Sequence, residues 1–218
     1  IGDSGVTIDS GNGTGTVTLS GTIVQINNLL DDTSTGTITY LNSSDTPGAS
    51  TTFTVTVNDS GNTGTDPGLT GDGTSEEGTN SQTINLTATN DDPTNPGSLP
   101  TDIAVTEDVS SNIDLSLINL ADVDAGGASL TVTLTTSTGG DISAAAGTGI
   151  TIGGTSTVRT LTGSLTDLNN YLDTASNLTY LHGTPHTNGN DADTIQVNVN
   201  DNGNTGTGGG TDINLGTV

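Results

Sequence analysis

Carboxylate and amide side chains gather at two places in the sequence where the chain could bind a metal ion. The segment ADVDAGG spans residues 121–127, and NDDPTNP spans residues 90–96. In an extended chain residues i and i+2 project to the same side, so Asp122 and Asp124 share one. The glycines that follow let backbone carbonyl groups turn inward. Ca²⁺ takes roughly six to eight oxygen ligands of these kinds, so the pattern predicts a calcium site.

The second segment supplies three more ligand side chains, Asn90, Asp91 and Asp92, and Pro93 and Pro96 stiffen the chain beyond them. Asp and Asn also favour turns, because their side chains hydrogen-bond to nearby backbone. We therefore interpret the isolated acidic residues as solvated turn residues, among them Asp9, Asp45 and Asp173.

Two well-known calcium loops fit the sequence poorly. An EF-hand loop that began at Asp122 would have Gly126 at its fifth position and Thr133, rather than Glu, at its twelfth. The repeated nonapeptide of calcium-binding β-rolls is absent, since GGGTD at 208–212 is one fragment without neighbours.

Enzyme chemistry finds little support in the sequence. His182 and His186 have no third clustered ligand for zinc, and no G-x-S-x-G motif is present. Paired carboxylates can hydrolyse sugars, but three Tyr, one Phe and no Trp offer few aromatic platforms for a sugar. A carbohydrate-binding module stays an alternative to a structural role. Ice binding is not supported, because the Thr-rich strands form no flat array of fixed repeat length. We expect no enzymatic activity.

The charge of the chain excludes several classes of partner. The 218 residues include 25 Asp and Glu but a single Lys or Arg, Arg159, which gives a formal net charge of −24. Binding to nucleic acids or to anionic lipids needs positive charge on the protein, so we expect neither.

Cysteine is absent, so neither disulfides nor thiolate metal sites can form. No apolar run approaches the roughly 20 residues of a membrane span, so we expect no membrane insertion.

High net charge and an apolar fraction of 28% are also the signature of disorder. Periodic strand patterns argue against disorder here, and bound cations would offset the repulsion between carboxylates. The first ten residues are not a signal peptide. We expect that one was removed or that the chain is part of something longer.

The sequence repeats itself once, with a copy that begins partway through its unit. VNDSGNTGT at 57–65 returns as VNDNGNTGT at 199–207, an offset of 201 − 59 = 142 residues between the two Asp. Flanking segments align at offsets of 140 to 144, so the unit is about 142 residues long. The segment 99–148 has no partner in the first copy. We predict a partial domain at 1–92, which lacks its N-terminal strands, and a second domain at 93–218.

Most of each copy reads as β-strand. Apolar and polar residues alternate in segments bounded by Gly, Asn and Asp, at 16–20, 52–58, 130–136 and 194–200. The alternation predicts one buried face on each strand, with Phe53, Val55 and Val57 in the first copy and Ile195, Val197 and Val199 in the second.

One short helix is expected in each copy. Leu165, Leu168 and Leu172 have helical spacing behind Ser164, a suitable N-cap. Ile23, Ile26 and Leu30 have the same spacing in the first copy. Many short strands with turn signals predict an all-β fold of antiparallel sandwiches.

The order of these motifs resembles a known family. NDDP between two β-copies, Glu107 just after it, Asp-x-Asp in ADVDAG and Asp-x-Gly in VNDNG are similar to the ligand scheme of cadherin-like domains. LTGSLTDLNNYL, LTY and IQVNVNDNGNTG resemble the tandem cadherin-like repeats of giant bacterial surface adhesins, including RTX-type ones, over nearly the whole second copy. The resemblance implies tandem Ig-like sandwiches, the first one incomplete, with Ca²⁺ between neighbours.

The resemblance also implies a ligand set. A junction ion would be bound by the linker residues Asn90, Asp91 or Asp92, by Asp122 and Asp124, and by Asp201 in a late loop. Asp59 would serve the equivalent junction before the first domain, and Glu107 would reach the far end of its own domain. The mid-domain acidic motif with an Arg, as in animal cadherins, has no counterpart here, which leaves the number of ions open.

The function that this family implies is mechanical. The chain would be an extracellular spacer or scaffold at the cell surface, stiffened by calcium, with neighbouring repeats or subunits of the same protein as partners. Adhesion to cell-surface or matrix ligands would belong to other domains. The strands missing from the first copy leave an open edge, which chain upstream could fill. Another subunit could also donate them in trans, and this is the alternative of a self-assembling filament or surface layer.

Overall fold

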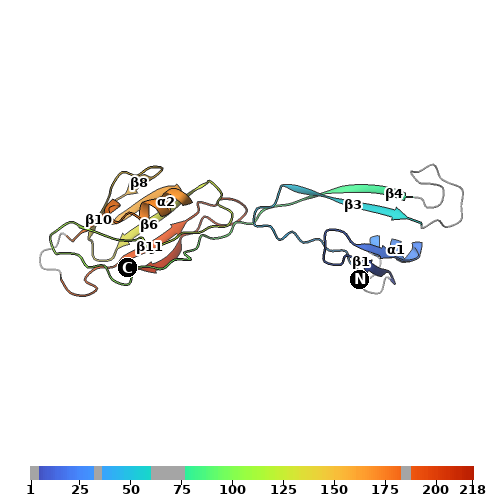
Figure 1. Ribbon diagram of the computed structural model, residues 1–218, viewed down its shortest axis with the longest axis horizontal. Helices are drawn as coiled ribbons and strands as arrows, with labels where there is room; N and C mark the ends of the chain where they lie inside the picture. The colour runs from blue at the N-terminus through green and yellow to red at the C-terminus, as the bar shows by residue number, and fades with distance from the viewer. Residues whose placement is uncertain (1–4, 32–35, 60–76, 183–187) are drawn as a thin grey trace. The chain divides into compact units, whose positions relative to one another are not determined.

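The computed structural model describes residues 5–31, 36–59, 77–182 and 188–218, and these are mostly β-structure (Figure 1). Antiparallel sheets and two short α-helices confirm the predicted all-β class and the one helix in each copy. The chain divides into two compact units, Ile1–Ser43 and Ser44–Val218. The boundary at residue 92, which follows the sequence repeat, stays a prediction. Within the described residues no helix is long and apolar enough to cross a lipid bilayer.

The first unit contains a two-stranded sheet and a helix. Strand β1 (Thr7–Ser10) pairs with β2 (Thr18–Ser20), and α1 spans Ile23–Leu30. Thr22 begins the helix with a complete capping box, because its hydroxyl accepts from the Gln25 N–H and the Gln25 side chain accepts from the Thr22 N–H at 2.8 Å.

A long hairpin opens the second unit. Strands β3 (Ser50–Asn58) and β4 (Glu77–Asn85) pair in antiparallel fashion over nine positions. The predicted buried face of β3 is wrong, since Phe53 is 40% exposed and Val57 49% exposed. The alternation is that of a strand, but among the described residues the side chains of β3 do not belong to the buried core, whereas those of its counterpart in the second copy, Val197 and Val199, do.

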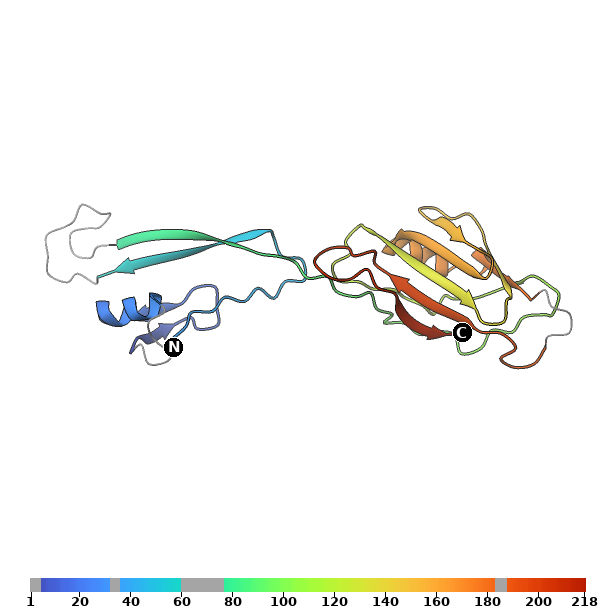
Figure 2. The same cartoon turned by 180° about the vertical axis from the view of Figure 1, so that it is seen from behind.

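The second copy builds two sheets around one core (Figure 2). The five-stranded sheet has the order β12-β11-β6-β9-β8, and the three-stranded sheet has the order β5-β10-β7. The strands are β5 (Ser111–Asn112), β6 (Ser129–Thr136), β7 (Asp141–Ala144), β8 (Thr151–Gly154), β9 (Val158–Ser164), β10 (Leu178–Leu181), β11 (Ile195–Asn200) and β12 (Ile213–Thr217).

Alternate residues of these strands form the core, as the period-2 pattern predicted. Val132 and Leu134 of β6 are buried, and so are Val197 and Val199 of β11. Helix α2 (Leu165–Leu172) follows β9 directly and starts at Ser164, whose hydroxyl accepts from the Asp167 N–H at 3.2 Å. Its buried residues, Leu168, Tyr171 and Leu172, belong to the same core. A short 3₁₀ turn, Ala175–Asn177, leads into β10.

Candidate metal centre

The NDDP segment is attached to two loops of the second copy. Thr89 bridges to Thr207, with the Thr207 N–H donating to Ala88 O at 2.9 Å. Farther along, Thr94 and Ala121 exchange two backbone hydrogen bonds of 2.7 and 2.9 Å. The segment therefore lies between the loop that follows β11 and the loop that precedes β6. These are the loops that contain Asp201 and the Asp-x-Asp pair.

Asp201 is completely buried and holds the first loop together. Its Oδ1 accepts from the N–H groups of Gly203 and Gly210, both at 3.0 Å, and its Oδ2 accepts from the side-chain amide of Asn90. Burial acts to raise the pKa of Asp201, but these hydrogen bonds outweigh it, so the pKa is lowered and the carboxylate stays charged.

Asp122 and Asp124 hold the second loop against the linker. The Oδ1 of Asp122 accepts from the N–H groups of Asp124 at 3.1 Å and Ala125 at 2.9 Å. The Oδ2 of Asp124, a residue only 2% exposed, accepts from the N–H of Asp91 at 3.1 Å. Thr205 from the first loop donates its hydroxyl to Asp124 O at 2.8 Å. The two loops and the linker thus form one connected network.

Three oxygens of this network are buried without a hydrogen bond from the described part of the chain. They are Asn90 Oδ1, Asp122 Oδ2 and Asp124 Oδ1. Burial is the largest cause that raises the pKa of Asp122, and the adjacent Asp124 carboxylate adds to it. A buried acceptor without a donor costs roughly 1–3 kcal/mol, and more when it is charged. A cation bound among these oxygens would remove that cost.

The composition of the cluster limits which cation it suits. Among the residues that the structure describes, no group of three or more His, Cys, Asp or Glu side chains is arranged to hold a metal. The described residues therefore form no site built from three such side chains alone. Calcium differs, because amide and backbone carbonyl oxygens serve it as well as carboxylates do. Hydrogen bonds connect Asn90 to Asp201, the Asp91 N–H to Asp124 and the Asp124 N–H to Asp122, so amide and carboxylate oxygens belong to one network.

Glycine lets the first loop approach the linker this closely. Gly209 has a φ of +73°, and a Cβ there would lie 2.1 Å from Asn90 Nδ2. The neighbouring Gly208 has a φ of +94°, and a Cβ there would meet nothing within 4 Å. Gly206 also lies against the linker, since a Cβ there would be 2.6 Å from Asn90 N, so two glycines of this loop allow its close approach.

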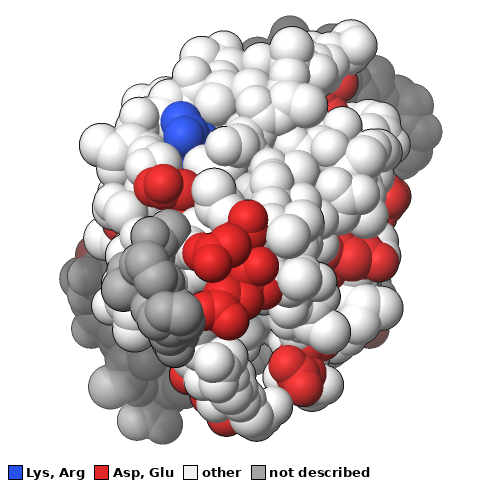
Figure 3. Space-filling model, turned by 90° about the vertical axis from the view of Figure 1, so that its left-hand side faces the viewer, with Lys and Arg blue, Asp and Glu red and all other residues white. Residues whose placement is uncertain are grey.

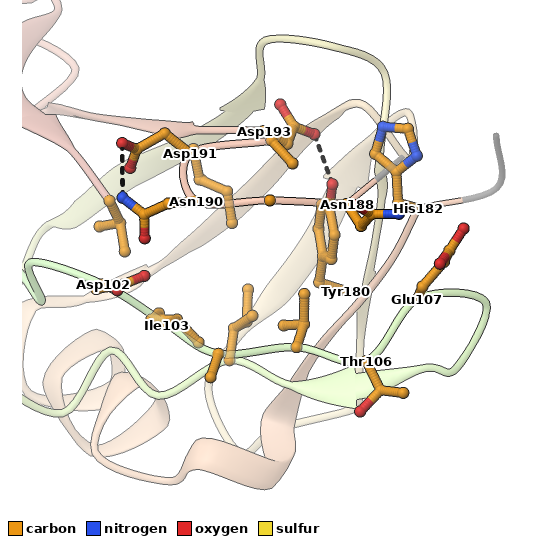
Figure 4. Close-up of a pocket in the computed structure, with 17 residues that line it drawn as sticks. Asp102, Ile103, Thr106, Glu107, Tyr180, His182, Asn188, Asn190, Asp191 and Asp193 are labelled. Carbon is orange, nitrogen blue, oxygen red and sulfur yellow. Dashed lines mark hydrogen bonds between the residues drawn. The ribbon is translucent and has the colours of Figure 1, made fainter. Parts of the chain in front are cut away.

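The other predicted ligands are exposed or lie apart from this network. Asp92 is exposed, and Asp59 is exposed at the end of β3. Glu107 lines a separate cavity of about 350 Å³, together with Tyr180, His182 and the last residue, Val218. Figure 4 shows this cavity. His186 lies outside the described residues.

Sequence reasoning missed Asp193, which lines the same cavity. Its carboxylate accepts from Tyr180 Oη at 2.7 Å, from Ser137 Oγ at 2.8 Å and from the N–H groups of Ser137 and Thr138 at 2.9 and 2.8 Å. Figure 4 shows the bond between Tyr180 and Asp193. Asp193 sits two residues before β11, a position where a turn residue is expected, so no sequence signal sets it apart.

The 25 acidic side chains of the chain far outnumber its one Lys or Arg. Figure 3 shows a face on which Asp and Glu side chains gather, with one blue group for the chain's single Lys or Arg. That residue, Arg159, donates to the backbone carbonyls of Ile142 and Gly153 at 3.0–3.2 Å. It stabilises the sheets and does not pair with the carboxylates of the candidate site.

Comparisons with protein-family models, with curated proteins and with solved structures found no match to this chain.

Proposed function

We propose that this chain is an extracellular structural repeat, stiffened by Ca²⁺, of the cadherin-like kind that occurs in large bacterial surface adhesins. It acts as a spacer or scaffold for cell adhesion and performs no catalysis. The buried oxygens of Asn90, Asp122 and Asp124 that lack hydrogen bonds from the described residues carry this proposal. They belong to two segments, NDDPTNP at 90–96 and ADVDAGG at 121–127, whose residue types predicted a calcium site.

Calcium fits this cluster better than magnesium does. Mg²⁺ requires near-ideal octahedral geometry and gives up its water reluctantly, whereas Ca²⁺ accepts irregular sets of carboxylate, amide and carbonyl oxygens. The cluster also combines several negative charges, and the Asp201 carboxylate stays charged because its hydrogen bonds lower its pKa. The bound ion would supply positive charge that this network does not contain.

A bound ion would have a mechanical effect because of where its ligands come from. Asn90 belongs to the linker, Asp122 and Asp124 to one loop, and Asp201 to another. An ion shared by all of them would restrain the linker relative to the domain that follows. Extracellular modules bind calcium with dissociation constants of about 10⁻⁴–10⁻³ M, which suits a protein that works outside the cell, next to further repeats or subunits.

Isothermal titration calorimetry on the 218-residue chain tests this function. We expect saturable Ca²⁺ binding that is weakened on the order of tenfold or more by D124N, because the variant removes charge from a buried ligand. Asp45→Asn is the matched control, since it removes the same charge from an exposed turn position. Equal affinities for the chain, D124N and D45N would show that calcium only screens the acidic surface, and the proposal would then fail.

A further inference from the structure

Among the residues that the structure describes, strand β3 is paired along one edge, while its counterpart in the second copy is paired along both. In the described residues β3 pairs only with β4, through nine positions from Ser50 to Asn58. Its counterpart β11 pairs with β12 on one side and with β6 on the other. The counterpart relation follows from the offset of 142 residues, which places Val55 on Val197 and Val57 on Val199.

Strand β2 of the first unit also has fewer strand partners among the described residues than β9, its counterpart in the second copy. It pairs with β1 in the register Thr7↔Ser20 and Ile8↔Leu19. Strands β8 and β9 pair in the equivalent register, Thr151↔Thr162 and Ile152↔Leu161. The other edge of β9 is occupied by β6. The local pairing of the two copies is thus the same, and β6 is the strand for which the first copy has no equivalent among the described residues.

The side chains of β3 are exposed where the first copy has no described equivalent of β6. Val57 is 49% exposed, whereas Val199 is fully buried at the equivalent position. In the second copy β6 lies between β9 and β11 and contributes Leu130, Val132 and Leu134 to the core. A strand with an open edge and an apolar face is a surface to which another strand can add.

We propose that the open edge of β3 binds an antiparallel strand of the β6 type from another repeat of this kind. The occupant is an extended segment that alternates aliphatic residues with Thr, as in SLTVTLTT at 129–136. The register follows from the second copy, where Val199 faces Val132 and Val197 faces Leu134. Val57 therefore faces the valine of the incoming strand, and Val55 faces its second leucine.

The occupant must be an unpaired segment rather than a second folded copy of this chain. In the folded chain β6 is the middle strand of a five-stranded sheet, and its Val132 and Leu134 are buried. It cannot be donated without dismantling that sheet. The proposal is independent of calcium, because it depends on strand pairing and on apolar burial alone.

Disulfide trapping tests both the pairing and its register, since the chain has no Cys of its own. The probe is a synthetic peptide with the sequence of residues 127–138 and Thr133→Cys. Thr133 pairs with Asn198, whose counterpart is the exposed Thr56. We expect the T56C chain to form the mixed disulfide on the order of tenfold faster than the T54C chain, because only Thr56 is in register. A peptide with Thr135→Cys should reverse this preference, since Thr135 pairs with Gln196, the counterpart of Thr54.

Fluorescence anisotropy of the labelled, cysteine-free peptide with the unmodified 218-residue chain provides a second measurement. Binding should be saturable and weakened on the order of tenfold or more in a peptide carrying V132D and L134D, because these changes remove apolar burial. Absence of saturable binding would overturn the proposal, and so would equal trapping at positions 54 and 56. A stable dimer trapped through two T56C chains, in preference to the peptide, would show that the edge pairs with a second copy instead.

Discussion

At the level of single residues, the two Asp residues of the repeated VND motif differ in burial because different segments surround them. Asp201 is buried and accepts hydrogen bonds from two glycine N–H groups and from Asn90. Asp59, in the same phrase, is exposed. The linker and the Asp-x-Asp loop that bury Asp201 have no equivalents in the described part of the first copy. The motif therefore predicts the same residue type at both positions, but the burial of Asp201 depends on segments far away in the sequence, such as the one that contains Asn90.

Asp193 gives the sharpest prediction at this scale. Burial acts to raise its pKa, but hydrogen bonds from Tyr180, Ser137, Thr138 and Thr194 hold that pKa well below the usual range. At pH 7, Asp193→Asn should lower the free energy of unfolding by about 2 kcal/mol, because amide oxygen and nitrogen cannot replace two carboxylate oxygens that accept several bonds. Urea unfolding followed by tyrosine fluorescence measures the difference.

The pH dependence of this effect has a definite sign. A depressed pKa in the folded state stabilises the protein above the unfolded pKa of about 3.9, and the contribution is lost as the pH falls below that value. The difference between the wild-type chain and D193N should therefore be constant from pH 7 to 5 and shrink below pH 4. D173N, at an exposed helix end, should stay within about 0.5 kcal/mol of the wild-type chain. A difference that grew on acidification would contradict this role of Asp193.

At the level of elements, the two copies show how far local sequence decides structure. TYL at 39–41 and TYL at 179–181 are the same three residues, yet only the second lies in a strand, β10. Strand β10 exists because β5 and β7 pair with its two edges. The helices, in contrast, appear in both copies, because capping residues and apolar spacing are local. Strand type and helix position were therefore predictable from the sequence, whereas the exposure of β3 and the irregular structure of residues 39–41 were not.

The candidate site likewise contains residues that the sequence could predict and contacts that it could not. The spacing of Asp122 and Asp124 and the NDDP linker could be recognised from residue type alone. The contact between Asn90 and Asp201 joins residues 111 positions apart, and the repeat pattern with its family resemblance was needed to expect it. Asp193 could not be found, because its partners Tyr180 and Ser137 meet it only after two sheets have formed.

The two helices lead to a prediction about local stability. Helix α1 has the complete capping box, but Ile23 is 78% exposed, whereas Leu168 and Leu172 of α2 are buried. Packing rather than capping supplies most of the stability of a helix this short. Hydrogen exchange should therefore be at least about tenfold slower in α2 than in α1.

Capping should still modulate α2. Ser164→Ala should speed amide exchange in α2 about fivefold, which corresponds to about 1 kcal/mol for a lost N-cap. Thr166→Ala, at an exposed position in the same helix, should leave the exchange unchanged or slow it slightly, because Ala is the better helix former. Equal protection of α1 and α2 in the wild-type chain would show that the first helix has packing partners that the structure does not describe.

At the level of the whole molecule, the charge of −24 and the proposed ion site would both affect how far the linker can move. Self-repulsion among carboxylates favours extended and mobile arrangements of a chain. An ion that joins Asn90, Asp122, Asp124 and Asp201 would restrain the linker at one point. Screening by salt and binding at the site therefore have different consequences, since only binding depends on those four residues.

Small-angle X-ray scattering separates the two effects. In 150 mM salt, where charges are screened beyond about 8 Å, we expect the maximum dimension and the distance distribution to differ between excess Ca²⁺ and a chelator. Mg²⁺ at the same concentration should have a much smaller effect, because it screens equally but fits the site less well. The double variant D122N/D124N should scatter alike in all three conditions, while D45N should respond as the wild-type chain does. A maximum dimension that calcium leaves unchanged in the wild-type chain would mean that the ion, even if bound, does not stiffen the linker.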